Sequence, residues 1–127
     1  MSARNRRRLL LVATIPLIIA GLWHVGAAAA IEAKARLGQW LLEDAWDRTL
    51  AGEERVRPWP WADTWPVARL EVPGHGIDLI VLADASGRSL AWAPGHVSGT
   101  ARPAASGLTI FGGHRDTHFR FLAALEP

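Results

Sequence analysis

The sequence contains no cysteine, and this absence excludes several kinds of chemistry within its 127 residues. Without thiols the chain forms no disulfide bonds, offers no thiolate ligands to a metal ion and supplies no cysteine nucleophile. Half of the residues are hydrophobic (50%) and a fifth are charged (20%). This composition excludes a disordered chain and suits one small folded domain with an additional segment.

The chain also lacks the concentration of basic residues that a nucleic-acid-binding surface needs. The formal net charge is +2, but arginines at positions 4, 6, 7 and 8 gather at the N-terminus, so the rest of the chain is net negative. The remaining Lys and Arg residues are scattered among acidic ones. Because a nucleic-acid binder gathers its basic residues on a folded face, we expect no nucleic-acid partner.

Several familiar catalytic motifs are missing. The sequence has no G-x-S-x-G nucleophile motif, no glycine-rich phosphate loop and no paired acidic motif. Ser98 lies near His96, but it falls in a stretch rich in Pro, Gly and Ser without the signature of a nucleophile. The sequence therefore predicts no cofactor.

A long apolar run near the N-terminus is the first feature that is present. Residues 9–31 are uncharged apart from His24, which interrupts the run as a titratable group. At about 1.5 Å per residue they span roughly 35 Å, enough to cross a hydrocarbon core of about 30 Å. Pro16 is compatible with a membrane helix. Since positive charges favour the cytoplasmic side, residues 1–31 are predicted to form an Arg-rich cytoplasmic tip and a single transmembrane anchor.

A cleaved signal peptide is the alternative interpretation of the same segment. Leu9–Trp23 is short enough for its apolar region, and Gly26–Ala30 offers A-x-A cleavage sites. The uncleaved anchor is favoured because residues compatible with a helix continue to Leu50 without a turn signal. Both interpretations place the rest of the chain outside the cytoplasm.

Residues 32–57 are predicted to form a helical stalk, with a helix that packs on the domain or lies at the bilayer surface as the other interpretation. Apolar residues recur in two adjacent rows typical of an amphipathic helix: Leu37, Leu41 and Ala45, and Leu42, Trp46 and Leu50. Gly52 and the prolines at 58, 60 and 66 then end the helix. The tryptophans at 59, 61 and 65 predict a strap over a β-domain, with a ligand-binding platform as the alternative.

Three short strands are predicted after this strap. Residues 67–72 alternate between apolar and polar side chains, and residues 77–82 form a more continuous apolar run with β-branched residues. We expect a third strand at 107–111 and a short turn or strand at 89–93. The chain is then expected to form a helix at 117–125, capped by Asp116 or Thr117, with Phe121 and Leu125 facing inward.

His114 is the candidate catalytic residue. It follows a predicted strand that ends in Gly112 and Gly113, where an imidazole with a pKa near neutrality suits proton transfer. A structural, hydrogen-bonded histidine is the alternative. His114 and His118 have the H-x-x-x-H spacing of a zinc site. We nevertheless expect no metal, because the two residues fall on different elements and no third ligand has a motif of its own.

The stretches around these residues resemble the sortases. The run PGHVSGTARPAASGLTIFGGHRDTHFRFL, residues 94–122, has the Pro-Gly loop, the Gly-led strand and the Gly-His-Arg sequence of that family. GGHRDTHFRFL is similar to the Gram-negative branch, as is PWPWADTWPVARLEV, residues 58–72, and the layout of anchor, stalk and extracytoplasmic domain. The resemblance implies an inner-membrane protein with a periplasmic domain.

The resemblance also implies a fold and an activity. Sortases are closed eight-stranded β-barrels that cleave an LPxTG-like C-terminal sorting signal of a cell-surface protein. A cysteine thiolate attacks the Thr carbonyl, and the acyl group passes to an amine acceptor. His114 matches the family's catalytic histidine, and Gly113 and Arg115 match its neighbours. The catalytic arginine of the family lies after the cysteine and is not Arg115.

The sequence departs from the family at two points. Leu108 stands where the family usually has Asn, and after Leu125 the family would continue with further strands, the TLxTC nucleophile and the arginine. We therefore expect a mainly β fold in which residues 58–127 form the incomplete N-terminal part of a sortase-type closed β-barrel, preceded by the transmembrane helix and stalk. As given, the chain is expected to be inactive. The alternative is a non-catalytic, membrane-anchored binding or scaffold module.

Overall fold

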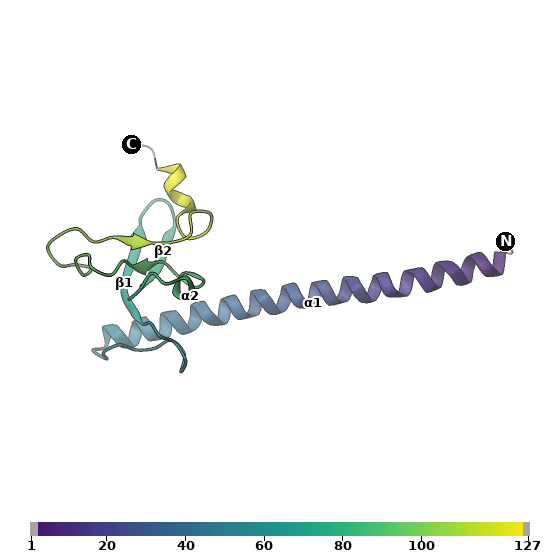
Figure 1. Ribbon diagram of the computed structural model, residues 1–127, viewed down its shortest axis with the longest axis horizontal. Coiled ribbons are helices and arrows are strands. Elements are labelled where there is room, and N and C mark those ends of the chain that lie inside the picture. Colours follow the sequence, from purple (N-terminus) through teal and green to yellow (C-terminus); the bar gives the residue numbers. More distant parts are fainter. Residues whose placement is uncertain (1–2, 126–127) are drawn as a thin grey trace. The chain divides into compact units, whose positions relative to one another are not determined.

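The computed structural model describes residues 3–125, except for the side chains of residues 3, 4, 6, 9 and 10. The elements follow the order α1 (Ala3–Leu50), β1 (Pro66–Val72), β2 (Ile77–Leu82), α2 (Gly87–Leu90), β3 (Gly95–His96), β4 (Phe111–Gly112) and a 3-10 helix η1 (Arg120–Ala124) (Figure 1). The chain divides into two compact units, one up to Arg36 and one from Leu37 onward.

Helix α1 confirms that the apolar run and the following residues form one helix. It continues through Pro16 without interruption. The stretch Leu11–Leu50 is long and apolar enough to cross a membrane, with a mean hydropathy of 1.8 in its most apolar window, none of which is buried. In the first unit Leu17 is 72% exposed and Trp23 is 76% exposed. Among the described residues of this unit, no other side chain buries them.

The second unit begins with the last turns of α1, and their buried face agrees only in part with the predicted rows. Gly38, Leu42 and Ala45 are buried, whereas the predicted Leu37 and Leu50 are 56% and 67% exposed. The reason is tertiary packing. The Trp92 ring lies so close to Gly38 that a Cβ atom there would collide with it, which moves the contact face onto the glycine.

The tryptophan-rich strap packs over the core of this unit, in agreement with its prediction. Trp59 stacks on Trp92 with ring centroids 4.8 Å apart, beside a buried cluster of Leu42, Leu82 and Ala93. The Trp65 carbonyl accepts a hydrogen bond of 2.9 Å from the Ala83 amide. Trp61 remains 77% exposed. The strap therefore holds the end of α1 and the end of β2 together.

The sheet is mixed and has the order β1-β2-β3-β4. Strands β1 and β2 form an antiparallel hairpin from Pro66↔Leu82 to Val72↔Ile77, which confirms the first two predicted strands. Its turn uses Gly74 and Gly76 at positive φ (89° and 63°), where other residues are strained. Strand β3 runs parallel to β2 through Leu82↔Gly95, and β4 runs antiparallel to β3.

The predicted third strand is wrong in most of its length. Only Phe111 and Gly112 form a strand, and Leu108 is 74% exposed. Residues 97–110 instead form a loop closed on itself, in which the Val97 amide donates to Ile110 and the Ala101 amide donates to Leu108, both at 2.9 Å. The sequence pattern alone could not show that the backbone of these residues pairs with a loop and not with another strand.

The C-terminal helix and the region after β2 also differ from their predictions. In place of a helix at 117–125, η1 covers Arg120–Ala124, and its first turn has no side-chain cap from Asp116 or Thr117. Phe121 is half-buried, but Leu125 is 40% exposed and does not face a core. Residues 87–90 form the short helix α2, and a turn follows at 91–92, so of the turn or strand expected at 89–93 the turn is confirmed in part and the strand is wrong.

The predicted mainly β class is wrong for the described residues. Helix α1 has 48 residues, whereas β3 and β4 have two residues each. The sheet is open, so a closed barrel is not shown within residues 3–125. A barrel needs enough tilted strands for its first and last members to pair, and four strands, two of them this short, do not provide them.

Candidate active site

His114 lies immediately beyond the end of β4, as its position in the sequence predicted. After Gly113 the chain enters a tight turn. The His114 carbonyl accepts hydrogen bonds from the amides of Thr117 (3.4 Å) and Phe119 (3.1 Å). The side chain of His114 is exposed. The imidazole is therefore carried by a hydrogen-bonded turn and remains accessible from solvent.

Gly113 lies in close contact with the turn where it folds back on β4. A Cβ atom at this position would lie 2.8 Å from Cε2 of Phe119. The Phe119 ring also meets Phe121 edge to face, with centroids 6.2 Å apart. The absence of a side chain at Gly113 thus lets an aromatic pair lie under the backbone that leads into His114.

His118 is a titratable neighbour of His114. The two ring centroids are 5.8 Å apart, and the His114 amide donates a hydrogen bond of 3.4 Å to Nδ1 of His118. Partial burial lowers the pKa of His118, and the nearby His114 lowers it further. Within the described residues no group of three His, Cys, Asp or Glu side chains is placed to hold a metal ion.

The two arginines of the turn differ in what they contact. Arg120 donates from Nε (3.0 Å) and Nη2 (2.8 Å) to the carbonyl of Asp116, which fastens the start of η1 to the turn. Arg115, next to the candidate histidine, is exposed. Arg120 is therefore a structural member of the turn that the sequence did not single out.

His96 holds the loop that precedes β4. Its Nε2 lies 2.9 Å from the Ala101 carbonyl and 3.0 Å from Oγ1 of Thr100, and its ring meets Phe111 edge to face. Ser98 is exposed in the same loop. These contacts give His96 a structural role, and they fix the direction from which β4 and His114 emerge.

A polar cluster around Asp84 was missed by sequence analysis. The Asp84 carboxylate accepts hydrogen bonds from the Ser86 amide (2.9 Å) and from the Ser89 hydroxyl (2.9 and 3.0 Å). Partial burial acts to raise the pKa of Asp84, but these hydrogen bonds outweigh it and the pKa is lowered. The spacing D-x-S-x-x-S was the available signal, since it is typical of an acidic residue beside a helix start.

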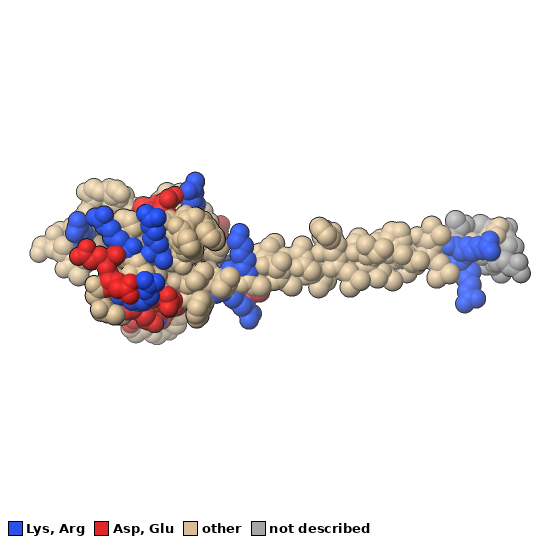
Figure 2. All heavy atoms as spheres, turned by 90° about the horizontal axis from the view of Figure 1, so that it is seen from below, with Lys and Arg blue, Asp and Glu red and all other residues tan. Residues whose placement is uncertain are grey.

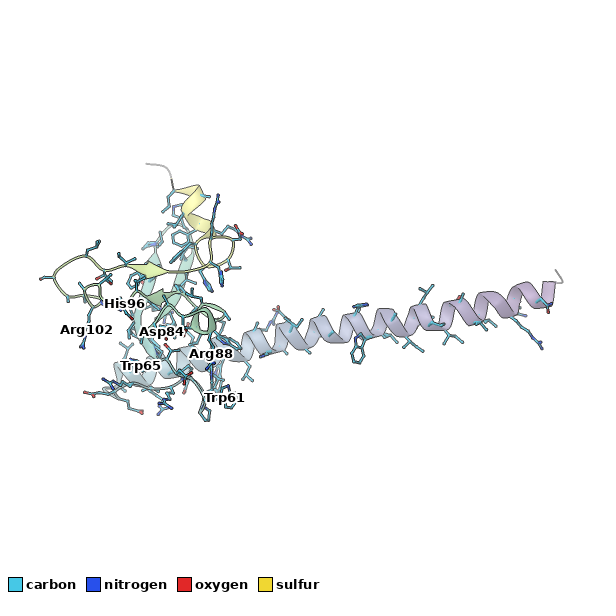
Figure 3. The ribbon with its side chains drawn as sticks, viewed as in Figure 1. Trp61, Trp65, Asp84, Arg88, His96 and Arg102 are labelled. Atoms are coloured by element: carbon cyan, nitrogen blue, oxygen red, sulfur yellow. The ribbon has the colours of Figure 1, made fainter. Side chains whose placement is uncertain are left out.

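Two cavities lie near this cluster and the strap. Figure 3 labels some of the residues that line them, among them Asp84, Trp65 and His96. The first, of about 470 Å³, is lined by Asp63, Thr64, Asp84, Ser86, Arg88 and Ser89. The second, of about 530 Å³, is lined by Thr49, Glu53, Glu54, Arg55, Trp65, Pro66, Val67, Ala83, His96, Arg102 and Pro103. His114 lines neither cavity.

Charged side chains of both signs are intermixed on the second unit (Figure 2). Arg69 on β1 contacts Asp78 on β2 (2.6 Å from Nε to Oδ1) and Glu43 on α1 (3.1 Å). Arg88 contacts Asp63 at 2.7 Å, with both side chains exposed. On the face in view, basic residues are accompanied by acidic ones and form no continuous basic stripe.

The comparisons with known proteins identify the part of the chain that contains this turn. The family model described as the sortase domain matches residues 70–127. No curated protein and no solved structure gave a significant match. The matched segment begins within β1 and includes the Asp84 cluster, the His96 loop and His114. Over residues 70–127, the chain is therefore similar to the sortase domain.

Proposed function

We propose that the chain is the membrane-anchored, histidine-bearing portion of a sortase-type cysteine transpeptidase. Its substrate is a cell-surface protein with an LPxTG-like C-terminal sorting signal, and the cleaved protein passes to an amine acceptor. The observation that carries this proposal is the coincidence of the sortase match with an exposed His114 at the end of β4, on a turn fixed by backbone hydrogen bonds.

His114 supplies the proton transfers of this reaction. In a cysteine transpeptidase the thiolate attacks the scissile carbonyl and forms a thioester. A histidine protonates the amine that leaves and later takes a proton from the amine that enters. An exposed imidazole at a strand end suits this role, because both amines reach it from solvent.

The 127 residues do not contain the nucleophile of this reaction, since they include no cysteine. On this proposal the thiolate comes from residues outside positions 1–127, and so does the catalytic arginine, which follows the cysteine in the family. On this proposal the chain by itself does not cleave a sorting-signal peptide. The same absence of cysteine favours the second candidate, a non-catalytic membrane-anchored binding or scaffold module.

We propose further that α1 anchors the protein in the inner membrane by a single span, with residues 1–31 as tip and anchor, 32–57 as stalk and 58–127 as the extracytoplasmic domain. The apolar stretch of α1 supports this assignment, as does the arginine cluster before it. A reporter enzyme that is active only outside the cytoplasm, fused after residue 125, is expected to be active. Retention of the full mass in the membrane fraction distinguishes the anchor from a cleaved signal peptide.

The decisive experiment begins with the coding DNA beyond codon 127, read in all three frames for a late strand ending in a TLxTC-like sequence followed by an arginine. The chain joined to that segment is expected to cleave an LPxTG-like peptide and to transfer it to an added amine. His114→Ala is expected to lower the rate by about 10² to 10⁴, the usual contribution of acid-base catalysis.

His75→Ala is the matched control for this variant. His75 is exposed in the turn between β1 and β2, and its substitution is expected to leave the rate unchanged. If no frame encodes such a segment, the transpeptidase proposal fails and the binding module replaces it. Cleavage by the 127 residues alone would contradict the proposed source of the nucleophile.

A further inference from the structure

The contact between His114 and His118 runs through the backbone. The His114 amide leaves β4 and donates to Nδ1 of His118 at 3.4 Å, while the His114 carbonyl accepts from Phe119 one residue further on. Both polar groups of the His114 backbone are thus held by the turn. The His118 side chain is half-buried, whereas that of His114 is exposed.

This geometry fixes the protonation state of His118. A backbone amide only donates, so Nδ1 of His118 must act as the acceptor and carry no proton. The neutral imidazole then keeps its single proton on Nε2. A protonated imidazole has a donor at both nitrogens and cannot accept from the amide. The hydrogen bond therefore exists only while His118 is neutral.

The surroundings of His118 favour the neutral form. Its partial burial lowers its pKa, and the second imidazole nearby acts in the same direction. The other charged residues of the turn are Arg115, Asp116 and Arg120, of which Arg120 is bound to the Asp116 carbonyl. No acidic side chain contacts His118 within the described residues, so no ion pair opposes this preference for the neutral form.

We propose that His118 is a positioning residue for His114: as a neutral acceptor it holds the His114 amide, and its protonation releases that amide and the start of the turn. This rests on the proposed function, in which His114 moves the protons. The consequence is that the turn keeps its geometry at neutral pH and loosens in acid, before the sheet itself is affected.

The first test uses the unaltered full chain in lipid nanodiscs, with histidine side chains and backbone amides labelled for NMR. The His118 nitrogens are expected to show the Nε2–H tautomer at neutral pH. The protection of the His114 amide against hydrogen exchange, corrected for the intrinsic pH dependence of exchange, is expected to fall about threefold to tenfold as His118 is protonated. An Nδ1–H tautomer, or protection that is unchanged across this titration, overturns the proposal.

The second test compares two isomeric replacements. In His118→Asn the amide oxygen occupies the place of Nδ1, whereas in His118→Gln it reaches the place of Nε2. We expect His118→Asn to keep the protection of the His114 amide and to remove its pH dependence, and His118→Gln to lose the protection. Equal behaviour of the two variants contradicts the proposal.

The β1–β2 hairpin amides provide the internal control for folding. They belong to the residue pairs from Pro66↔Leu82 to Val72↔Ile77, and they must remain protected against hydrogen exchange in both variants. If a variant loses this protection it has unfolded, and the tautomer and titration of the unaltered chain decide alone. These readouts involve no peptide cleavage. His118 can therefore fail as an acceptor while His114→Ala still lowers the transpeptidation rate, and this outcome overturns the present inference alone. If His118 acts as an acceptor but His114→Ala leaves the transpeptidation rate unchanged, only the proposed function is refuted.

Discussion

The β1–β2 hairpin and the segment that carries His114 are held by different kinds of contact. In the hairpin, six residue pairs follow one another between Pro66 and Leu82, and Val81 and Leu82 are completely buried. The segment from residue 97 to residue 125 has a two-residue strand, loop hydrogen bonds and no fully buried side chain. The part that bears the candidate chemistry is thus the less stabilised part, as is common for functional regions.

The largest expected effect separates a buried leucine of the hairpin from an exposed leucine of the other segment. Leu82→Ala removes a side chain that is 0% exposed and should lower the free energy of unfolding by about 2–5 kcal/mol. Leu108→Ala, at a residue that is 74% exposed, should change it by less than about 0.5 kcal/mol. Equilibrium unfolding in a mild detergent, followed by tryptophan fluorescence, measures both. Equal losses would remove the distinction between the two regions.

Two glycines sharpen the comparison. At Gly95 a Cβ atom would lie 2.8 Å from the Ala85 Cα and closer still to the Asp84 carbonyl, so backbone must move. At Gly113 it would meet the Phe119 ring, a side chain that is able to rotate. We expect Gly95→Ala to cost about 1–3 kcal/mol and Gly113→Ala to cost less, while altering the NMR signals of His114. Thermal unfolding measures the two losses of stability, and the NMR spectra report on His114. A larger loss of stability in Gly113→Ala than in Gly95→Ala would contradict this prediction.

Acid tests the hydrogen-bonded carboxylate that follows β2. The pKa of Asp84 is lowered in the folded chain, so its stabilising effect is complete above the unfolded value near 3.9 and is lost as the pH falls through the folded value. Asp84→Asn should cost about 1 kcal/mol at neutral pH and weaken the loss of stability below about pH 4.

Asp116→Asn is the matched control in the His114 turn. There Arg120 contacts the Asp116 carbonyl of the backbone, so changing the side chain should alter stability by less than about 0.5 kcal/mol. Unfolding curves recorded between pH 7 and pH 2 test both variants. If Asp84→Asn and the unaltered chain lose the same stability between pH 4 and pH 2, Asp84 does not titrate as described.

The smallest expected effect concerns the arginines of the two regions. Hydrogen bonding to Asp78 raises the pKa of Arg69, which also contacts Glu43. Arg69→Gln should destabilise the hairpin slightly, and less so at high salt. Arg120→Gln, which loses contacts to one carbonyl, should cost a similar amount but without the salt dependence. Unfolding at low and high salt distinguishes them, and a salt-independent Arg69→Gln would contradict the ion-pair description.

What the sequence predicted well follows from local patterns. The alternation at 67–72 and the apolar run at 77–82 gave both hairpin strands, because their partners are only a turn apart. The helical pattern likewise extended through α1. The buried face of the last turns of α1 was predicted only in part, because it also depends on Trp92, which lies far along the chain and packs on Gly38.

The candidate site was predicted in position but not in setting. His114 follows a strand, as expected, but that strand has two residues and not five. The acceptor role of His118 and the contact of Phe119 with Gly113 depend on how the turn folds back, which no periodicity encodes. The Asp84 cluster was missed for a related reason. Its D-x-S-x-x-S spacing indicates a hydrogen-bonded carboxylate only if a helix begins there, and a helix of four residues gives no periodic signal in the sequence.

The loop between β3 and β4 is closed at its base by His96 and by the hydrogen bond from Val97 to Ile110. Its far end, residues 104–107, is exposed and contains Ala104 and Gly107 at positive φ (63° and 123°). A short peptide epitope inserted between residues 105 and 106 therefore extends into solvent, since added length in a closed surface loop costs little. This loop offers a position for labelling or immobilising the protein that leaves the base of the loop, and the approach to His114, as they are.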